Sequence, residues 1–215
     1  MRLVPVPGVF KPHSDSLMLA QQLRSEPLGA CSTVLDLCTG SGVLAITAAL
    51  CGARRVIAVD VSRRALLAVR LNAKLNGANV HTVRGSLFEP VHDQRFDLIV
   101  SNPPYLPSAS DELPDRGRSR AWEGGVQGRA LIDPICGEAA THLRPGGRLL
   151  LTHSSLCSEH LTMEALVSHG FMVEVLRSRG PLGRLASARA DMLRARGLLP
   201  NGDSEEILIF RALWT

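Results

Sequence analysis

Short aliphatic runs alternate with segments of helical periodicity along most of this chain. Such alternation is typical of right-handed βαβ units, which build a mostly parallel sheet with helices on both faces. The helix expected at 62–76 has the clearest bounds, with Ser62 as its N-cap, leucines at positions 67, 71 and 75, and Gly77 as its terminator. The expected strands are 33–37, 55–60, 80–84, 96–101, 147–153, 171–177 and 206–212, and the expected helices are 14–25, 42–51, 62–76, 129–143 and 155–169.

The alternation fails near the carboxyl end of the chain. Residues 178–204 form a long segment, rich in arginine, that leads directly into the last expected strand. A strand that enters a sheet without a full crossover helix is expected to insert antiparallel. We therefore expect an α/β fold in one domain, with seven mostly parallel strands, helices on both faces and an antiparallel last strand.

The length and composition exclude several other classes of protein. The chain has 215 residues, of which 45% are hydrophobic and 20% charged, which suits one globular domain and excludes a coiled coil, collagen and a disordered chain. The longest apolar stretch, Val43–Cys51, is far shorter than the roughly 20 residues of a membrane span. The N-terminus lacks the apolar run of a secretory signal, so we expect a cytoplasmic protein. The 5 cysteines are widely spaced and indicate neither a disulfide framework nor a metal site.

A glycine-rich turn follows the first expected strand. The sequence 36–42, Asp-Leu-Cys-Thr-Gly-Ser-Gly, leads into a helix, where a ligand can approach the backbone and the helix N-terminus favours negative charge. Asp60 ends the second strand, 20 residues after Gly40, where a carboxylate can accept hydrogen bonds from ribose hydroxyls. These features indicate a cofactor that contains adenosine. The spacing Gly40-x-Gly42-x-x-Ala45 also satisfies the dinucleotide pattern, so a nicotinamide dinucleotide is the alternative to S-adenosylmethionine.

Two features favour S-adenosylmethionine. Asp36 precedes the turn, where it can face the ammonium group of a methionine tail and would repel a pyrophosphate. The fourth expected strand leads into Asn-Pro-Pro-Tyr at 102–105, whose two prolines hold the loop extended. The Asn102 amide oxygen and the Pro103 carbonyl are two neighbouring acceptors, a pair that suits a planar NH2 group. Tyr105 is positioned to stack on the face of that group.

These motifs resemble the class I S-adenosylmethionine-dependent methyltransferases that modify planar nitrogens, and more narrowly the HemK family. Further matches are Phe-Lys-Pro-His-Ser-Asp-Ser at 10–16, Gly-Ser-Leu-Phe at 85–88 and Ala-Trp-Glu-Gly-Gly-Val-Gln-Gly at 121–128. The resemblance covers residues 9–177 and the last strand. It implies a Rossmann-like sheet and methyl transfer to the side-chain amide of a glutamine, in a protein of the release-factor or ribosomal type.

The resemblance also implies roles for individual residues. Asn102 and Pro103 orient the acceptor nitrogen, with Tyr105 beside them as the third catalytic residue. Segment 1–30 covers the cofactor, and the long polar loop 106–128 is interpreted as the part that binds the substrate. The implied cofactor-binding residues are Asp15, Ser16, Asp36, Thr39, Gly40, Gly42, Asp60, Val61, Ser86, Leu87 and Asn102.

The chain departs from the family pattern at three points. Cys38 and Ser86 replace the usual glycine and the usual acidic residue, and because only about 30 residues precede the first expected strand, we expect the chain to lack the N-terminal helical domain of long bacterial members. In this respect the chain is similar to short eukaryotic and archaeal members, which work with a small zinc-binding activator protein. The strand expected at Val80–Arg84 lies at a sheet edge, where we expect such a partner.

Two other functions stay open at this point. The exocyclic amine of an adenine or guanine in RNA or DNA fits the same pair of acceptors. The arginines between Arg179 and Arg196 are candidates for RNA contact, with a solvated helix face as the alternative, and the net charge of +4 modestly favours an anionic partner. Because Cys38 and Ser86 are unusual, a decayed enzyme that serves as a binding scaffold is the third hypothesis.

Overall fold

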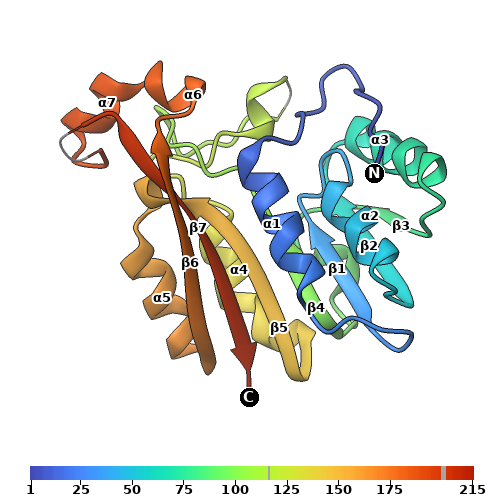
Figure 1. The fold of residues 1–215 in the computed structure, drawn as a ribbon. Helices are drawn as coiled ribbons and strands as arrows, with labels where there is room; N and C mark the ends of the chain where they lie inside the picture. Colours follow the sequence, from blue (N-terminus) through green and yellow to red (C-terminus); the bar gives the residue numbers. More distant parts are fainter. Residues whose placement is uncertain (116, 200–201) are drawn as a thin grey trace.

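A seven-stranded sheet with the strand order β3-β2-β1-β4-β5-β7-β6 forms the centre of the molecule (Figure 1). The computed structural model describes residues 1–115, 117–199 and 202–215. Arg116 of the expected substrate loop, and Pro200 and Asn201 of the arginine-rich segment, lie outside the described residues. The strands are β1 (Thr33–Leu37), β2 (Arg55–Asp60), β3 (His81–Arg84), β4 (Phe96–Ser101), β5 (Leu143–Ser154), β6 (Phe171–Pro181) and β7 (Ser204–Trp214).

The first described helix precedes β1, the others lie between the strands in the chain, and helices flank the sheet (Figure 1). Strands β3, β2, β1, β4 and β5 pair in parallel, and β7 is inserted antiparallel between β5 and β6. The expected fold class is therefore confirmed, including the antiparallel last strand. The α-helices are α1 (Ser14–Arg24), α2 (Val43–Leu50), α3 (Arg63–Leu75), α4 (Ile132–Glu138), α5 (Glu159–Ser168), α6 (Arg184–Ser187) and α7 (Ala190–Ala195).

Both faces of the sheet are covered because successive strand residues point to opposite sides. On one face, Val34 belongs to a core cluster that also holds buried residues of α1, α2 and α3. On the other face, the next residue, Leu35, belongs to a cluster with buried residues of α4 and α5. The central strands β1 and β4 are buried at almost every position, as expected of a sheet that is covered on both faces.

A third, smaller core cluster joins the arginine-rich segment to the expected substrate loop. Leu193 of α7 and Leu182 pack with Leu106, which directly follows the Asn-Pro-Pro-Tyr sequence. Figure 1 shows α6 and α7 at the same end of the molecule as that loop. Two short helices, α6 and α7, lie in this segment, and their buried residues Ala186 and Leu193 belong to the same cluster.

Two helices differ from their expected form. The expected helix 129–143 is shorter: α4 begins at Ile132, and a 3-10 turn, Ala139–His142, follows it. The expected helix 155–169 is interrupted at Ser158, whose positive φ of 61° separates a 3-10 turn, Ser155–Cys157, from α5. Within the described residues, no helix is long and apolar enough to cross a membrane.

The leucines that mark α3 in the sequence do not face the core. Leu67, Leu71 and Leu75 are 48%, 46% and 48% exposed. The buried side chains of α3 are mostly small ones: Ala65, Leu66, Ala68, Val69, Asn72 and Ala73. Small residues allow the helix to approach the sheet closely, so the larger leucines remain on the outer side.

Candidate active site

A pocket opens at the carboxyl ends of β1, β2 and β4, which is the edge where open α/β sheets bind ligands. The glycine-rich turn forms its floor. Gly42 has a φ of 84°, and a Cβ there would lie 3.1 Å from the Val69 side chain, so the turn and its close packing on α3 both require glycine. Among the predicted cofactor residues, those that line the pocket are Ser16, Thr39, Gly40, Asp60, Val61, Ser86, Leu87 and Asn102.

The Asp60 carboxylate connects the glycine-rich turn to the start of α3. Its Oδ2 accepts a hydrogen bond from Gly40 N at 3.0 Å, and its Oδ1 accepts one from Ser62 N at 2.8 Å. Burial raises the pKa of this carboxyl above its ordinary value, while the backbone donors act in the opposite direction. Asp60 also lines the pocket, so it is positioned to meet a polar ligand as well as to hold the turn.

Asp36 lies beneath the turn and does not line the pocket. The carboxylate is fully buried, and its Oδ2 accepts hydrogen bonds from Thr39 Oγ1 at 2.5 Å and Ala45 N at 3.0 Å. Its Oδ1 is buried without a hydrogen-bond partner among the described residues. Burial raises the pKa of Asp36 to about 7, and the nearby Asp60 charge adds to this effect.

Asn102 lies at the end of β4 in a small hydrogen-bond network. Its Nδ2 donates to Asp15 Oδ2 at 3.0 Å and to Ser16 Oγ at 2.9 Å. The Tyr105 hydroxyl donates to the same Asp15 oxygen at 2.9 Å. Burial and the Asp15 charge raise the pKa of Tyr105 well above its ordinary value, so the hydroxyl remains a donor. Both hydrogen bonds of the Asn102 amide use its nitrogen, which leaves its oxygen available as an acceptor.

The glycines of the segment 121–128 allow it to pack directly against the Asn-Pro-Pro-Tyr loop. A Cβ on Gly124 would lie 2.8 Å from Pro104 O, and one on Gly128 would lie 2.3 Å from Tyr105 O. Hydrogen bonds from Leu106 N to Trp122 O (2.7 Å) and from Gly124 N to Leu106 O (2.9 Å) join the two stretches. This packing gives a physical reason for glycine at these positions.

Several site residues were not found from the sequence. The segment before α1 covers the pocket with Gly8, Val9, Phe10 and Pro12, and the loop after Tyr105 adds Leu113, Gly117, Arg120 and Glu123. Asn72, fully buried, accepts a hydrogen bond from Val4 N at 2.7 Å and donates one to Ser41 O at 3.0 Å, so it ties the covering segment to the glycine-rich turn. A polar residue on the buried side of α3 was the available sequence signal for Asn72.

Two cysteines are part of the site framework. Cys38 lines the pocket and has a φ of 57°, in the left-handed region that favours glycine. Cys157 donates from Sγ to Tyr105 O at 3.0 Å, and burial raises the pKa of its thiol to about 12. Cys157 therefore supports the loop as an uncharged thiol.

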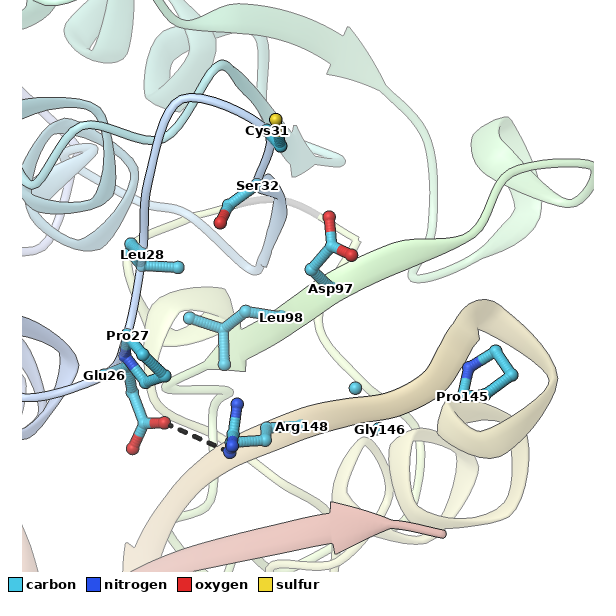
Figure 2. Close-up of a pocket in the computed structure, with 11 residues that line it drawn as sticks. Glu26, Pro27, Leu28, Cys31, Ser32, Asp97, Leu98, Pro145, Gly146 and Arg148 are labelled. Carbon is cyan, nitrogen blue, oxygen red and sulfur yellow. Dashed lines mark ion pairs between the residues drawn. The ribbon is translucent and has the colours of Figure 1, made fainter.

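A second hollow lies at the opposite edge of the sheet, near the amino ends of β1, β4 and β5 (Figure 2). Its walls hold the Glu26–Arg148 ion pair, with 3.5 Å between Oε2 and Nε, and Asp97, whose Oδ2 accepts from Thr33 N at 2.7 Å. Glu26 also accepts a hydrogen bond from Arg211 Nε at 2.6 Å. The contacts of Glu26 join β5 and β7 to the segment that follows α1, which is a structural function.

The fold is the Rossmann-like fold of class I methyltransferases. Solved structures agree with the fold: a methyltransferase from Pyrococcus furiosus has a TM-score of 0.64 at 21% identity, with 97% of this chain and 87% of that chain covered. The ribosomal protein L11 methylase from Lactobacillus delbrueckii subsp. bulgaricus has a TM-score of 0.61 at 23% identity, with 94% and 81% covered.

Sequence comparison gives the family. The model of the methyltransferase small domain matches residues 1–113. A relative from Methanocaldococcus jannaschii, whose name describes a protein N5-glutamine methyltransferase, is 36% identical over 169 residues, which cover 79% of this chain and 84% of the relative. The chain therefore belongs to the HemK family of methyltransferases.

Two bacterial relatives extend this comparison. The release factor glutamine methyltransferase of Mycolicibacterium smegmatis is 35% identical over 186 residues, which cover 83% of this chain and 65% of the relative. The ribosomal protein uL3 glutamine methyltransferase of Bradyrhizobium diazoefficiens is 41% identical over 128 residues, which cover 56% and 40%. The chain thus spans less than two thirds of these longer relatives.

The cofactor of this methyltransferase is S-adenosylmethionine, and the residues present fit it. The buried Asp36 Oδ1 without a partner is suited to a nearby positive charge, as the methionine ammonium would supply. Gly40 lines the pocket and has only Cys38 O, at 3.9 Å, near the place of a Cβ, so a ligand has room to approach the backbone there, and the Asp60 carboxylate lines the same pocket.

Proposed function

We propose that this protein methylates the side-chain amide nitrogen of a glutamine in a protein substrate. The observation that carries the proposal is the orientation of Asn102, whose amide nitrogen is occupied by Asp15 and Ser16. Its oxygen and the Pro103 carbonyl are then the acceptors for a planar NH2 group. The names of the relatives, which describe glutamine methyltransferases for release factors and ribosomal protein uL3, support the same substrate class.

The chemistry requires alignment and acceptors more than a strong base. When bound, S-adenosylmethionine supplies the methyl group: the amide nitrogen forms the new N–C bond, the C–S bond breaks with its electron pair on sulfur, and one N–H proton leaves for water. Positive charge develops on the nitrogen, so acceptors that already point at its N–H groups stabilise the transition state. Asn102 Oδ1 and Pro103 O perform this task, and Tyr105 forms the wall beside them.

We propose that the cofactor is held by residues from several elements. Thr39 and Gly40 form the floor, Gly42 lets the turn pack on α3 beneath it, and Asp60 with Val61 binds the ribose hydroxyls. Ser86 and Leu87 contact the adenine, where the neutral serine hydroxyl is a weaker acceptor than a carboxylate. Asp36 supports the turn from below and compensates the ammonium charge across a short distance, and Ser16 closes the pocket from α1.

The single domain is divided by task in this proposal. Residues 1–30 cover the cofactor, 106–128 bind the substrate, and the segment 178–204 supports the substrate loop. Support for the last assignment comes from Arg189, which donates to Pro107 O at 2.8 Å and to Glu123 Oε1 at 2.7 Å. Arg196 Nη1 donates to Ser108 O at 2.7 Å.

The contacts of the arginines between Arg179 and Arg196 favour a role in holding the substrate loop over a role in RNA contact. Arg189 and Arg196 bind the substrate loop, and Arg194 forms ion pairs with Asp191 and Asp203. Methylation of a base amine in RNA or DNA remains the second candidate because it uses the same acceptors. The experiment below separates the two.

A zinc-binding activator is proposed at the β3 edge. In the described sheet β3 pairs with β2 on one side and leaves its other side open. Next to it, α3 exposes the three leucines Leu67, Leu71 and Leu75, and Arg70 Nε of α3 donates to Thr82 Oγ1 of β3 at 2.7 Å. An open strand edge beside apolar side chains suits a protein partner. Full activity of the purified chain alone would show that no activator is required.

Methyl-labelled S-adenosylmethionine provides the test. Purified protein is incubated with a release factor, with ribosomal protein uL3 and with total RNA, and label is followed after protease or RNase treatment. We expect label in a protein that survives RNase, and loss of labelling when the accepting glutamine is replaced by asparagine. Label that survives protease and is removed by RNase would instead show methylation of a base amine in RNA.

A further inference from the structure

We infer that Asp15 is a positioning residue that fixes the orientation of the Asn102 amide and strengthens its oxygen as an acceptor. The inference rests on the proposed function, because Asn102 is taken as the group that orients the acceptor nitrogen. It assigns Asp15 to the acceptor side of the site, whereas the family resemblance implies a contact with the cofactor.

The Asp15 carboxylate is held at both oxygens. It lies in the first turn of α1, and its Oδ1 accepts a hydrogen bond from Ser16 N at 2.7 Å. Its Oδ2 accepts from Asn102 Nδ2 at 3.0 Å and from the Tyr105 hydroxyl at 2.9 Å. A carboxylate fixed in this way presents one oxygen in a defined place to two residues of the Asn-Pro-Pro-Tyr loop.

The orientation of an asparagine amide depends on its partners, because its oxygen and nitrogen ends have nearly the same shape. If the Asn102 amide were turned over, its oxygen would face Asp15 Oδ2 at about the distance of the present hydrogen bond, 3.0 Å. Two acceptors at that distance repel each other. Asp15 therefore selects the orientation in which Asn102 Oδ1 is available to the substrate.

The charge of Asp15 has a second effect on Asn102. A hydrogen bond from an amide nitrogen to a carboxylate is charge-assisted, and hydrogen bonds in a chain polarise one another. Electron density shifts toward Oδ1, which becomes a better acceptor as positive charge develops on the substrate nitrogen. Asn102 alone would be a neutral amide, and Asp15 lets it act as a partly anionic acceptor.

The position of Asp15 outside the cofactor pocket distinguishes the orientation of Asn102 from a role in cofactor binding. Ser16 lines the cofactor pocket, whereas Asp15 does not. Loss of the Asp15 carboxylate is thus expected to reduce the rate of methyl transfer while S-adenosylhomocysteine binds with nearly unchanged affinity. A contact between Asp15 and the cofactor predicts the opposite result.

A double-mutant cycle provides the kinetic test, with kcat and the KM for the protein substrate measured for each variant. Asp15→Ala is expected to lower kcat at least about 30-fold, and Asp15→Asn about 10-fold because a neutral oxygen still accepts from Nδ2. In the Asn102→Ala background the Asp15→Ala change is expected to cost less than about threefold, because Asp15 acts through Asn102. Independent, multiplying losses in the cycle would overturn the inference.

Two controls accompany the cycle. The Kd of S-adenosylhomocysteine is expected to change less than about threefold in Asp15→Ala, and a large loss would assign Asp15 to the cofactor instead. Asp93→Ala removes an exposed carboxylate at 87% side-chain exposure and is expected to leave kcat unchanged. Melting temperatures of all variants show whether each one is folded.

A measurement without turnover keeps this inference separate from the proposed function. The side-chain NH2 signals of Asn102 in an ¹⁵N-resolved NMR spectrum are assigned by their loss in Asn102→Ala. Asp15→Ala is expected to shift them and to speed their exchange with water. If glutamine proteins accept no methyl group while these signals respond to Asp15, the proposed function fails and the positioning stands. If the signals are unaffected by Asp15→Ala, the positioning is wrong whatever the substrate.

Discussion

Asp15 Oδ2 lies 3.0 Å from Asn102 Nδ2, although the two residues are 87 positions apart in the chain. The acceptor end of the Asn102 amide is therefore set by a residue of α1, before the first strand of the sheet. The conformation of the Asn-Pro-Pro-Tyr loop alone does not set it. This relationship changes what conservative substitutions at position 102 are expected to do.

Asn102→Asp is expected to be as inactive as Asn102→Ala at pH 8, despite the similar shape of the two side chains. The new carboxylate faces that of Asp15, and two like charges at this distance repel each other. Initial rates of methyl transfer for both variants are the measurement. Retention of more than about a tenth of the parental rate by Asn102→Asp would show that acceptor shape alone is sufficient.

Gly128→Ala is expected to destabilise the protein by at least about 2 kcal/mol and to lower activity. The residue has a φ of 74°, and the added Cβ would lie 2.3 Å from Tyr105 O, so the catalytic loop must move. Gly137→Ala is the matched control: no heavy atom is within 4 Å of its Cβ, and alanine in α4 is expected to stabilise by about 0.5–1 kcal/mol. Urea unfolding of both variants gives the comparison, and equal effects would contradict the packing argument.

The free energy of unfolding of the protein without cofactor is expected to decrease as the pH rises, because of Asp36. Its pKa is raised from 3.8 to about 7 by burial, so the folded chain binds this proton more tightly than the unfolded chain does. The resulting contribution, on the order of 4 kcal/mol, is present below pH 3.8 and is lost as the pH rises to about 7.

The difference between the parent and Asp36→Asn isolates this effect. Burial lowers the pKa of His153 to about 4, so His153 acts in the opposite direction between pH 4 and 6.5, but it is present in both proteins. Unfolding free energies at pH 4.5 and 7.5 are the measurement. A difference between the two proteins that does not depend on pH would mean that Asp36 titrates normally.

Asp60→Ala is expected to weaken S-adenosylhomocysteine binding by about 1.5 to 3 kcal/mol, the range for hydrogen bonds to a charged acceptor. The Gly40 N–H also loses its partner at 3.0 Å, which adds to the effect by loosening the turn. Isothermal titration gives the affinity directly. An unchanged Kd would show that Asp60 does not bind the cofactor.

The local part of the fold could be predicted from the sequence. The bounds of β1, β2 and β4 agree with expectation because each strand contains a short aliphatic run, which in β2 and β4 ends at a polar residue, Asp60 or Ser101. The strands β5, β6 and β7 extend beyond the expected runs. The outer residues of β6 and β7 are held by the antiparallel ladder between them, which runs as far as the pair Pro181 and Ser204, and pairing of this kind leaves no hydrophobic pattern.

The candidate site, like the fold, could be predicted from the sequence only in its local parts. The glycine-rich turn and the Asn-Pro-Pro-Tyr loop are continuous motifs, and the structure brings them to one edge of the sheet. The contacts of Asp15 with Asn102, of Cys157 with Tyr105 and of Arg189 with Pro107 join residues far apart in sequence. Such contacts depend on the packing of whole elements, and no spacing along the chain indicates them.

Asn102→Ala tests the central claim most directly, with turnover and cofactor affinity measured on the same preparation. The Asn102 oxygen orients the acceptor nitrogen, while the glycine-rich turn and Asp60 hold the cofactor. Methyl transfer is therefore expected to fall at least about 100-fold, with the Kd of S-adenosylhomocysteine within about threefold of the parent. Near-parental turnover on any identified acceptor would contradict the pair of acceptors, and with it the assignment of the chemistry to this loop.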